Sequence, residues 1–238
     1  MVKTKNEETL IVMCNGPSLK DVDFDSLRPH NCFGMNGAYR YYYKHNWWPR
    51  YFSCFDRVVT INHTESYTKM INDKEVPIER FFLLMPITPN PKLSVLPLNG
   101  PIYTFSNNFK TFGNGGNTGA NSCQSGICMG YKKIILLGAD CNYVEVVEGA
   151  TGFKANGKWP QLKMDKTPDN NPNYFFDDYQ QKGDVYNYPQ AGKFHQPAWE
   201  SLATYAKSIG VDIVNCSDIS TLTCFRKSSL EKELSLIS

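Results

Sequence analysis

Residues 8–20 read Glu-Thr-Leu-Ile-Val-Met-Cys-Asn-Gly-Pro-Ser-Leu-Lys, an apolar run that leads directly into a polar turn. This pattern is typical of a buried parallel strand that ends at the ligand-binding edge of an α/β sheet. Gly16 allows the backbone to approach a ligand closely, and Pro17 sets φ for a helical turn after it. Because free N–H groups at such a turn bind anions, we expect a ligand site that includes Asn15, Gly16 and Ser18.

Polar residues follow several other apolar runs in the same way. The expected strands after the first cover residues 32–35, 51–55, 81–85, 134–137 and 211–214, and the expected helices cover 38–45, 58–73, 120–129 and 198–208. This alternation predicts an α/β fold with an open, mostly parallel Rossmann-like sheet and helices on both faces. The strand ends would then bring Asn36, Asp56 and Asp140 beside Asn15 at one edge of the sheet.

A glycine-rich turn, Phe-Gly-Asn-Gly-Gly-Asn-Thr-Gly, covers residues 112–119 just before a helix of small residues. Four glycines in such a short stretch are also compatible with simple flexibility. We expect Thr118 to cap the helix, which leaves backbone N–H groups free for a phosphate. Asn117, Thr118 and Gly119 are therefore predicted to contact the same ligand.

Residues 141–194 show no clean periodicity and hold many aromatic side chains among Pro, Asn, Asp and Gly. A segment of this length inside a compact domain is usually functional or disordered, and the aromatic content favours an ordered, irregular lid. We therefore expect one domain, residues 1–238, with a lid over residues 141–194.

The composition excludes several classes of protein. The net charge of +2 without a long basic run argues against nucleic-acid binding. Eight cysteines without a CxxC pair favour reduced, buried thiols over a zinc site, and they suggest a cytoplasmic protein. The start of the chain lacks a signal-peptide core, and no apolar stretch reaches the roughly 20 residues of a membrane helix. Asp23-Phe24-Asp25 has an Asp-x-Asp pattern, but we expect Asp25 to cap a helix and predict no metal site.

Several of these motifs occur in an order that resembles a known family of proteins. They are Cys-Asn-Gly-Pro-Ser-Leu-Lys at 14–20, the Asn36 turn, Asn-Thr-Gly at 117–119, the run 130–140 and the region of His195. In this order they resemble the bacterial sialyltransferases of glycosyltransferase family 42 and the wider group of surface-polysaccharide and flagellin-glycosylation proteins.

The resemblance implies a Rossmann domain with a lid, a CMP-sugar donor, inversion at the anomeric carbon, and no metal or cofactor. It also implies that His195 is the general base, although a lone histidine is more often structural. Asn15 and Asn36 match donor-binding asparagines, and 117–119 matches a Thr-Ser-Gly turn. Two lid tyrosines would stabilise the departing phosphate, for which Tyr143 is the first choice and Tyr179 the second.

The sequence departs from the family pattern at three places. Asp56 stands where the sialyltransferases carry an asparagine, and Gly115 stands where they carry a substrate-pocket arginine. Asn142 aligns with the first phosphate tyrosine, so Tyr143 is only its neighbour. The second tyrosine cannot be aligned, and four residues remain candidates: Tyr174, Tyr179, Tyr186 and Tyr188.

The expected activity is transfer of an acidic sugar, a sialic-acid-like nonulosonate or Kdo, from CMP to a bacterial surface glycan such as lipopolysaccharide or capsule. A lipid-linked acceptor would bring the protein to the inner face of the cytoplasmic membrane, and a homo-oligomer is compatible with the family. One alternative is a magnesium-dependent pyrophosphokinase or phosphotransferase on the same fold, with Asp56 and Asp140 near the phosphates. Another is a non-catalytic module that binds a nucleotide or a glycan.

Overall fold

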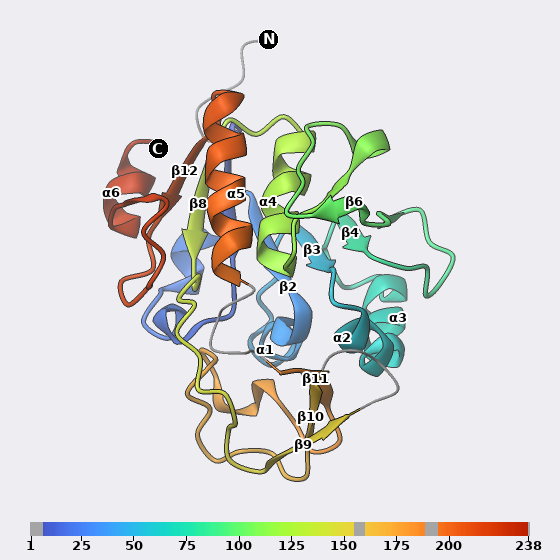
Figure 1. The fold of residues 1–238 in the computed structure, drawn as a ribbon. Coiled ribbons are helices and arrows are strands. Elements are labelled where there is room, and N and C mark those ends of the chain that lie inside the picture. The colour runs from blue at the N-terminus through green and yellow to red at the C-terminus, as the bar shows by residue number, and fades with distance from the viewer. Residues whose placement is uncertain (1–6, 155–159, 189–194, 238) are drawn as a thin grey trace.

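The computed structural model describes residues 7–154, 160–188 and 195–237. Its centre is an eight-stranded sheet in the order β13-β12-β8-β1-β2-β3-β4-β5, in which every paired neighbour is parallel (Figure 1). The strands are β1 (Thr9–Met13), β2 (Cys32–Met35), β3 (Tyr51–Cys54), β4 (Arg80–Leu83), β5 (Leu93–Val95), β8 (Lys133–Leu137), β12 (Asp212–Asn215) and β13 (Arg226–Lys227). The predicted α/β class and parallel Rossmann-like sheet are confirmed.

The first strand lies at the centre of the sheet because both of its faces are apolar. Leu10 and Val12 pack into one hydrophobic cluster, and Ile11 and Met13 pack into a second cluster on the opposite face. From β1 the chain continues through β2, β3 and β4 on one side of the sheet, and it later returns to form β8 on the other side. The strand order therefore reverses between β1 and β8, which is where α/β sheets of this kind bind ligands.

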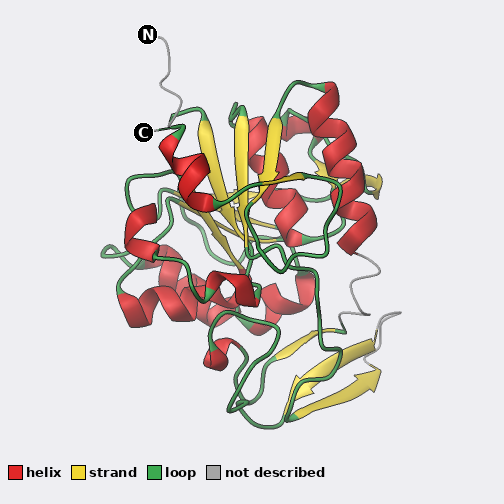
Figure 2. Ribbon diagram, turned by 90° about the vertical axis from the view of Figure 1, so that its left-hand side faces the viewer, coloured by secondary structure: helices red, strands yellow, loops and turns green. Residues whose placement is uncertain are grey.

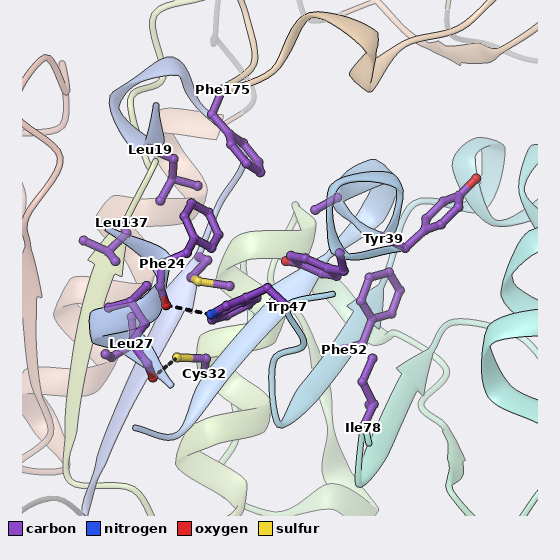
Figure 3. Close-up of a cluster of buried hydrophobic side chains, with 14 of the residues drawn as sticks. Leu19, Phe24, Leu27, Cys32, Tyr39, Trp47, Phe52, Ile78, Leu137 and Phe175 are labelled. Atoms are coloured by element: carbon purple, nitrogen blue, oxygen red, sulfur yellow. Dashed lines mark hydrogen bonds between the residues drawn. The ribbon is translucent and has the colours of Figure 1, made fainter. Parts of the chain in front are cut away.

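Helices cover both faces of the sheet (Figure 2). The cluster that contains Leu10 packs against α4 (Thr118–Cys128) and α5 (His195–Ser208). The other cluster packs against α1 (Tyr39–His45), α3 (Thr64–Asn72) and α6 (Leu230–Ser235). In this second cluster Trp47 is buried, and its indole N–H donates to the carbonyl oxygen of Phe24 at 2.6 Å (Figure 3). Trp47 is therefore a core residue.

Several local expectations differ from the structure. The helix expected over 58–73 is two helices, α2 (Arg57–Asn62) and α3, which meet at His63. His63 leaves helical geometry with φ −104° and ψ 14°, and the Tyr39 hydroxyl lies 3.0 Å from its Nδ1. A further short strand, β6 (Asn99–Ile102), pairs with β7 (Gly113–Asn114) and lies outside the expected strands. It ends where Tyr103 takes a φ of +69°, which cannot continue a strand.

The cap of the short helical turn after residue 23 also differs from the expectation. Asp23, and not Asp25, precedes the 3₁₀ turn Phe24–Leu27 and accepts a hydrogen bond from the Asp25 N–H at 3.0 Å. The elements β5, β13 and α6 were not expected from the sequence. In α6 the Ser229 side chain accepts from the Lys232 N–H at 3.3 Å, which is an ordinary serine cap.

The lid contains regular structure that the sequence did not predict. Its strands β9 (Ala150–Lys154), β10 (Pro160–Met164) and β11 (Val185–Asn187) form a small antiparallel sheet below the main sheet in Figure 1. Within it, Leu162 pairs with Tyr186, far along the chain. The prediction of an irregular lid is therefore wrong for the segments that form β9, β10 and β11. The lid residues 155–159 and 189–194 lie outside the described part.

No helix among the described residues has both the length and the apolar character that crossing a membrane requires. All eight cysteines are free thiols.

Candidate active site

A cavity of about 460 Å³ lies between the carboxyl ends of the strands and the lid. Nearly all of the residues predicted for the site line it, namely Asn15, Gly16, Asn36, Asp56, Asn117, Thr118, Gly119, Asp140, Tyr143, Tyr179 and His195. Segments far apart in the sequence therefore meet at one place, as the motif order predicts. What each residue does there is a separate question, which depends on its contacts.

Three asparagines on the wall of the cavity have amide atoms without a hydrogen-bond partner among the described residues. The Asn15 Nδ2 donates to the Met35 carbonyl oxygen at 3.2 Å and to the Tyr179 hydroxyl at 2.9 Å, but its buried Oδ1 accepts from no described residue. The Oδ1 of Asn36 and the Nδ2 of Asn117 are also buried and unpaired. A buried polar atom without a partner is costly. These atoms therefore leave this wall with unused capacity both to donate and to accept hydrogen bonds.

The backbone of Asn36 supports the same interpretation. Its φ is +53°, in the left-handed region that few residues other than glycine adopt, although asparagine tolerates it better than most. The next residue, Gly37, leaves room for the lid, since a Cβ there would lie 2.9 Å from the Tyr179 ring. This turn is thus shaped both for a ligand and for close packing of the lid.

The turn after β1 is held by a carboxylate from the turn after β8. Asp140 accepts hydrogen bonds from the Ser18 N–H at 2.8 Å and from the Ser18 hydroxyl at 2.5 Å. A Cβ on Gly16 would lie 2.3 Å from the Asp140 Oδ2, so glycine is required for these two turns to touch. Ser18 does not line the cavity. Its expected ligand contact is therefore replaced by a contact that joins two strand ends.

Burial raises the pKa of Asp140, and the two hydrogen bonds from Ser18 oppose that effect. The carboxylate thus belongs to the frame of the site, although part of Asp140 faces the cavity.

The glycine-rich turn begins α4, but its cap is Asn117 and not Thr118. The Asn117 Oδ1 accepts from the Ala120 N–H at 2.8 Å. Thr118, the first residue of the helix, accepts from the Phe55 N–H at 3.3 Å and so joins the turn to the end of β3. An asparagine side chain reaches the N–H three residues on as readily as threonine does, which is why spacing alone could not separate the two.

Glycines 115 and 119 are confined by neighbouring side chains. A Cβ on Gly119 would lie 2.7 Å from Trp199, and a Cβ on Gly115 would lie 2.8 Å from the Asn121 Oδ1. An arginine does not fit at position 115 without displacement of its surroundings. Any cation of this cavity must therefore come from another segment.

Asp56 follows β3 and caps α2. Its Oδ1 accepts from the Val58 and Val59 N–H groups at 2.8 and 3.1 Å, and Asn187 of the lid donates to both of its oxygens at 3.2 and 3.1 Å. Burial raises its pKa, and these hydrogen bonds act in the opposite direction. Asp56 therefore links the sheet edge to the lid.

The first residue of α5 is His195, which lies against Tyr143. Their ring centroids are 5.3 Å apart. Burial lowers the pKa of His195 to about 4, so its imidazole is neutral at pH 7 and can accept a proton. Burial also raises the pKa of Tyr143 well above its usual range, so this phenol keeps its hydrogen. The pair combines a proton acceptor and a hydrogen-bond donor in one wall of the cavity.

Tyr179 has the most definite hydroxyl geometry of the lid tyrosines. Its oxygen accepts from the Asn15 Nδ2 at 2.9 Å and from the Gly37 N–H at 3.0 Å, so its own hydrogen is left for a third group. Tyr174 stacks on its ring with centroids 3.7 Å apart. By contrast, the hydroxyls of Tyr186 and Tyr188 contact the Met164 sulfur at 3.1 Å and Glu145 at 2.6 Å. Tyr179 is therefore the better-placed candidate.

The sequence analysis missed several residues at the cavity, among them His63, Asp184 and Asn187, and it also missed Arg40 of α1, which contacts the lid. Arg40 donates to both carboxylate oxygens of Asp184 at 2.6 and 2.9 Å and to the Tyr179 carbonyl oxygen at 2.6 Å. His63 lines the cavity, and burial lowers its pKa to about 4. None of these residues stands in a recognisable motif, so only their spatial neighbours identify them.

Within residues 7–154, 160–188 and 195–237, no group of three or more His, Cys, Asp or Glu side chains is arranged to hold a metal ion.

This combination of a parallel sheet, a cavity at its switch point and a docked lid defines a Rossmann-like fold with a candidate ligand site. No family model matches the chain, and no curated protein matches it either. Among solved structures, it is similar to the sialyltransferase CstII from Campylobacter jejuni in complex with a substrate analogue, CMP-3FNeuAc. That match has 16% identity and a TM-score of 0.52, and it covers 93% of this chain and 85% of that one.

A second similar structure is the MAf glycosyltransferase from Magnetospirillum magneticum AMB-1, with 11% identity and a TM-score of 0.51. The match covers 96% of this chain but 34% of that one, so this chain spans about a third of that protein. At such identities the likeness concerns the fold. The chain has the fold of sialyltransferase-like glycosyltransferases, as the resemblance of its motifs predicted.

Proposed function

We propose that this protein is an inverting glycosyltransferase that moves an acidic sugar from a CMP-sugar donor to a bacterial surface glycan without a metal ion. The observation that carries the proposal is the set of unpaired, buried amide atoms of Asn15, Asn36 and Asn117 in the same cavity as a neutral histidine. The shared fold with CstII, whose structure holds a CMP-sugar analogue, adds support.

In this proposal the neutral imidazole of His195 accepts the proton of an acceptor hydroxyl. The acceptor oxygen then attacks the anomeric carbon and forms the new glycosidic bond. The bond between that carbon and the phosphate oxygen breaks, and its electron pair leaves with CMP. Because attack and departure occur on opposite faces of the carbon, the configuration inverts.

The departing phosphate needs hydrogen-bond donors that are already in place. Tyr143 and Tyr179 supply phenolic hydrogens, and the start of α4 supplies backbone N–H groups near Asn117. Asp56 and Asp140, the carboxylates of a magnesium-dependent alternative, already accept hydrogen bonds from groups of the protein. We therefore favour the transferase over the phosphotransferase.

The proposal also includes the acceptor and the place of action. An acidic sugar moved onto a lipid-linked surface glycan would require work at the inner face of the cytoplasmic membrane, which we propose as the site of action. We also propose that the protein forms a homo-oligomer, which a measurement of its mass in solution tests.

A thermal-shift panel of CMP, CDP, UDP, GDP and ATP, each with Mg²⁺ or with EDTA, tests the proposal, because a ligand of the native state raises its melting temperature. We expect CMP to give the largest shift and to keep it in EDTA. A CMP-sialic acid should also be hydrolysed slowly in EDTA. A response to ATP that requires Mg²⁺ would instead indicate the phosphotransferase, and CMP binding without hydrolysis would indicate a binding module.

A further inference from the structure

The charges around the cavity are unbalanced. Three carboxylates line it, those of Asp56, Asp140 and Asp184, whereas Arg57 is the one lysine or arginine among the described lining residues. His63 and His195 add no positive charge at neutral pH, since burial lowers the pKa of each to about 4. An anionic donor therefore meets a single cation in this part of the site.

Arg57 also differs from most other arginines in having no side-chain partner among the described residues. Arg28, Arg40, Arg50 and Arg226 each form an ion pair with a carboxylate. Arg57 makes no ion pair or hydrogen bond through its side chain with the described residues, and it is exposed. Two of the carboxylates that line the cavity are already engaged, because Asp56 is bound by its own helix and by Asn187, and Asp184 is bound by Arg40.

The position of Arg57 in the fold brings it close to the predicted phosphate site. It is the first residue of α2, directly after the turn of β3. Two residues earlier, the Phe55 N–H contacts Thr118 at the start of α4. On the other side, α2 lies against β11 of the lid, where the Val185 N–H donates to Asn62 at 3.2 Å. Arg57 thus stands between the glycine-rich turn and the lid.

We propose that Arg57 binds an oxyanion of the sugar-nucleotide donor, either a phosphate oxygen or the carboxylate of the transferred sugar. A guanidinium suits both groups, because its fixed fork of N–H donors pairs with two oxygens at once. The proposal rests on the proposed function, in that the anion belongs to a CMP-linked acidic sugar. It places the cation on α2, since position 115 has no room for one.

Calorimetric titration of Arg57→Gln, Arg57→Lys and wild type with four probes tests this assignment: cytidine, CMP, CMP-sialic acid and inorganic phosphate. Arg80→Gln is the matched control. Arg80 is also exposed, but it is the first residue of β4 and so lies at the amino ends of the strands, away from the carboxyl ends that line the cavity. We expect Arg57→Gln to weaken CMP-sialic acid roughly ten- to a hundredfold. Cytidine binding should not change, and Arg57→Lys should recover part of the loss.

The two sources of the anion give different results. Equal losses for CMP and CMP-sialic acid identify the phosphate, and a loss confined to CMP-sialic acid identifies the sugar carboxylate. Unchanged binding of all the anionic probes in Arg57→Gln, or an equal loss in Arg80→Gln, overturns the proposal. If wild type binds phosphate through Arg57 but does not bind cytidine, the result supports Arg57 as an anion-binding residue and contradicts the proposed CMP-sugar function.

Discussion

One wall of the cavity is built from the turns after β1, β2 and β3, and the facing wall is built from lid residues 173–188. The first wall continues directly from strands that are buried and paired on both sides. The second wall is joined to the first by polar contacts, among them Asn15 with Tyr179, Arg40 with Asp184, and Asp56 with Asn187. Phe175 and Tyr179 of the lid also belong to the hydrophobic cluster on the α1 face of the sheet. Because β11 belongs to the small lid sheet and not to the main sheet, we expect the lid wall to open at a lower free energy than the main sheet.

This difference assigns separate tasks to the two walls. Under the proposed function, the strand-end wall would hold the nucleotide through Asn15, Asn36 and the start of α4. The lid wall brings Tyr179 to Asn15 and Gly37, so its hydroxyl is in place only when the lid is docked. We infer that binding depends mainly on the first wall and that turnover depends on both.

The largest expected effect is that of His195→Ala. Loss of a general base lowers turnover by a factor on the order of 10²–10⁴, while CMP affinity should stay close to wild type because the nucleotide wall is intact. Steady-state kinetics with CMP-sialic acid, together with calorimetry, measures both quantities. His45→Ala, at an exposed position of α1, is the control. An unchanged turnover number would remove His195 from the mechanism.

Arg40→Met should break the link between the walls. The Arg40 and Asp184 side chains are each 14% exposed, and removal of one partner leaves the other charge uncompensated, at a cost of about 3–5 kcal/mol. Hydrogen exchange should rise in residues 173–188 and not in β1 or β8. Arg40→Lys should recover part of the protection. Uniform loss of protection in sheet and lid would show that the two walls unfold as one unit.

Tyr179→Phe should reduce turnover about a hundredfold, the usual effect of losing one donor to a developing charge. The Asn15 Nδ2 and the Gly37 N–H also lose an acceptor, which lowers the free energy of unfolding by about 1–3 kcal/mol. Kinetics and urea denaturation separate the two effects. Tyr188→Phe, whose hydroxyl contacts Glu145 instead, should leave turnover unchanged. Equal losses in both variants would contradict a specific role for Tyr179.

The smallest effect concerns pH and stability. His63 and His195 have a pKa of about 4 in the folded protein, below the usual value near 6.5. Between these values the unfolded chain binds protons that the folded protein does not, so the free energy of unfolding falls as pH falls from 6.5 to 4. Each histidine contributes at most about 1.4 kcal/mol per pH unit.

Urea denaturation of wild type and His195→Ala from pH 8 to pH 4 measures this contribution, because the raised pKa values of Asp56 and Asp140 are common to both proteins. The variant should show the weaker dependence below pH 6.5. Identical slopes would mean that His195 is accessible to protons in the folded state.

The strand-end wall was largely predictable from the sequence. Asn15, Asn36, Asp56 and Asp140 each come at the end of a short apolar run, and the carboxyl ends of parallel strands must meet at one edge. The finer roles were less predictable. Ser18 and Asp140 bind each other, and Asn117 takes the cap expected of Thr118. The first contact joins two turns that are far apart in the chain, and in the second two neighbouring polar residues could each cap the same helix, so spacing in the sequence could not predict either one.

The lid wall could not be predicted in the same way. Arg40 and Asp184 are far apart in the chain, as are Asp56 and Asn187, and no periodic pattern surrounds either lid residue. The strands of the lid pair with one another and not with the main sheet, so alternation of apolar and polar residues is weak there.

Local hydrophobic pattern by itself thus determined the parallel sheet, the position of its ligand edge and the asparagines that stand there. Tertiary structure alone determined which tyrosine reaches that edge, which arginine lines the cavity, and how the lid is held. The physical reason is that a buried strand is specified by its own side chains, whereas a docked lid is specified by pairs of side chains that become neighbours only after the chain has folded.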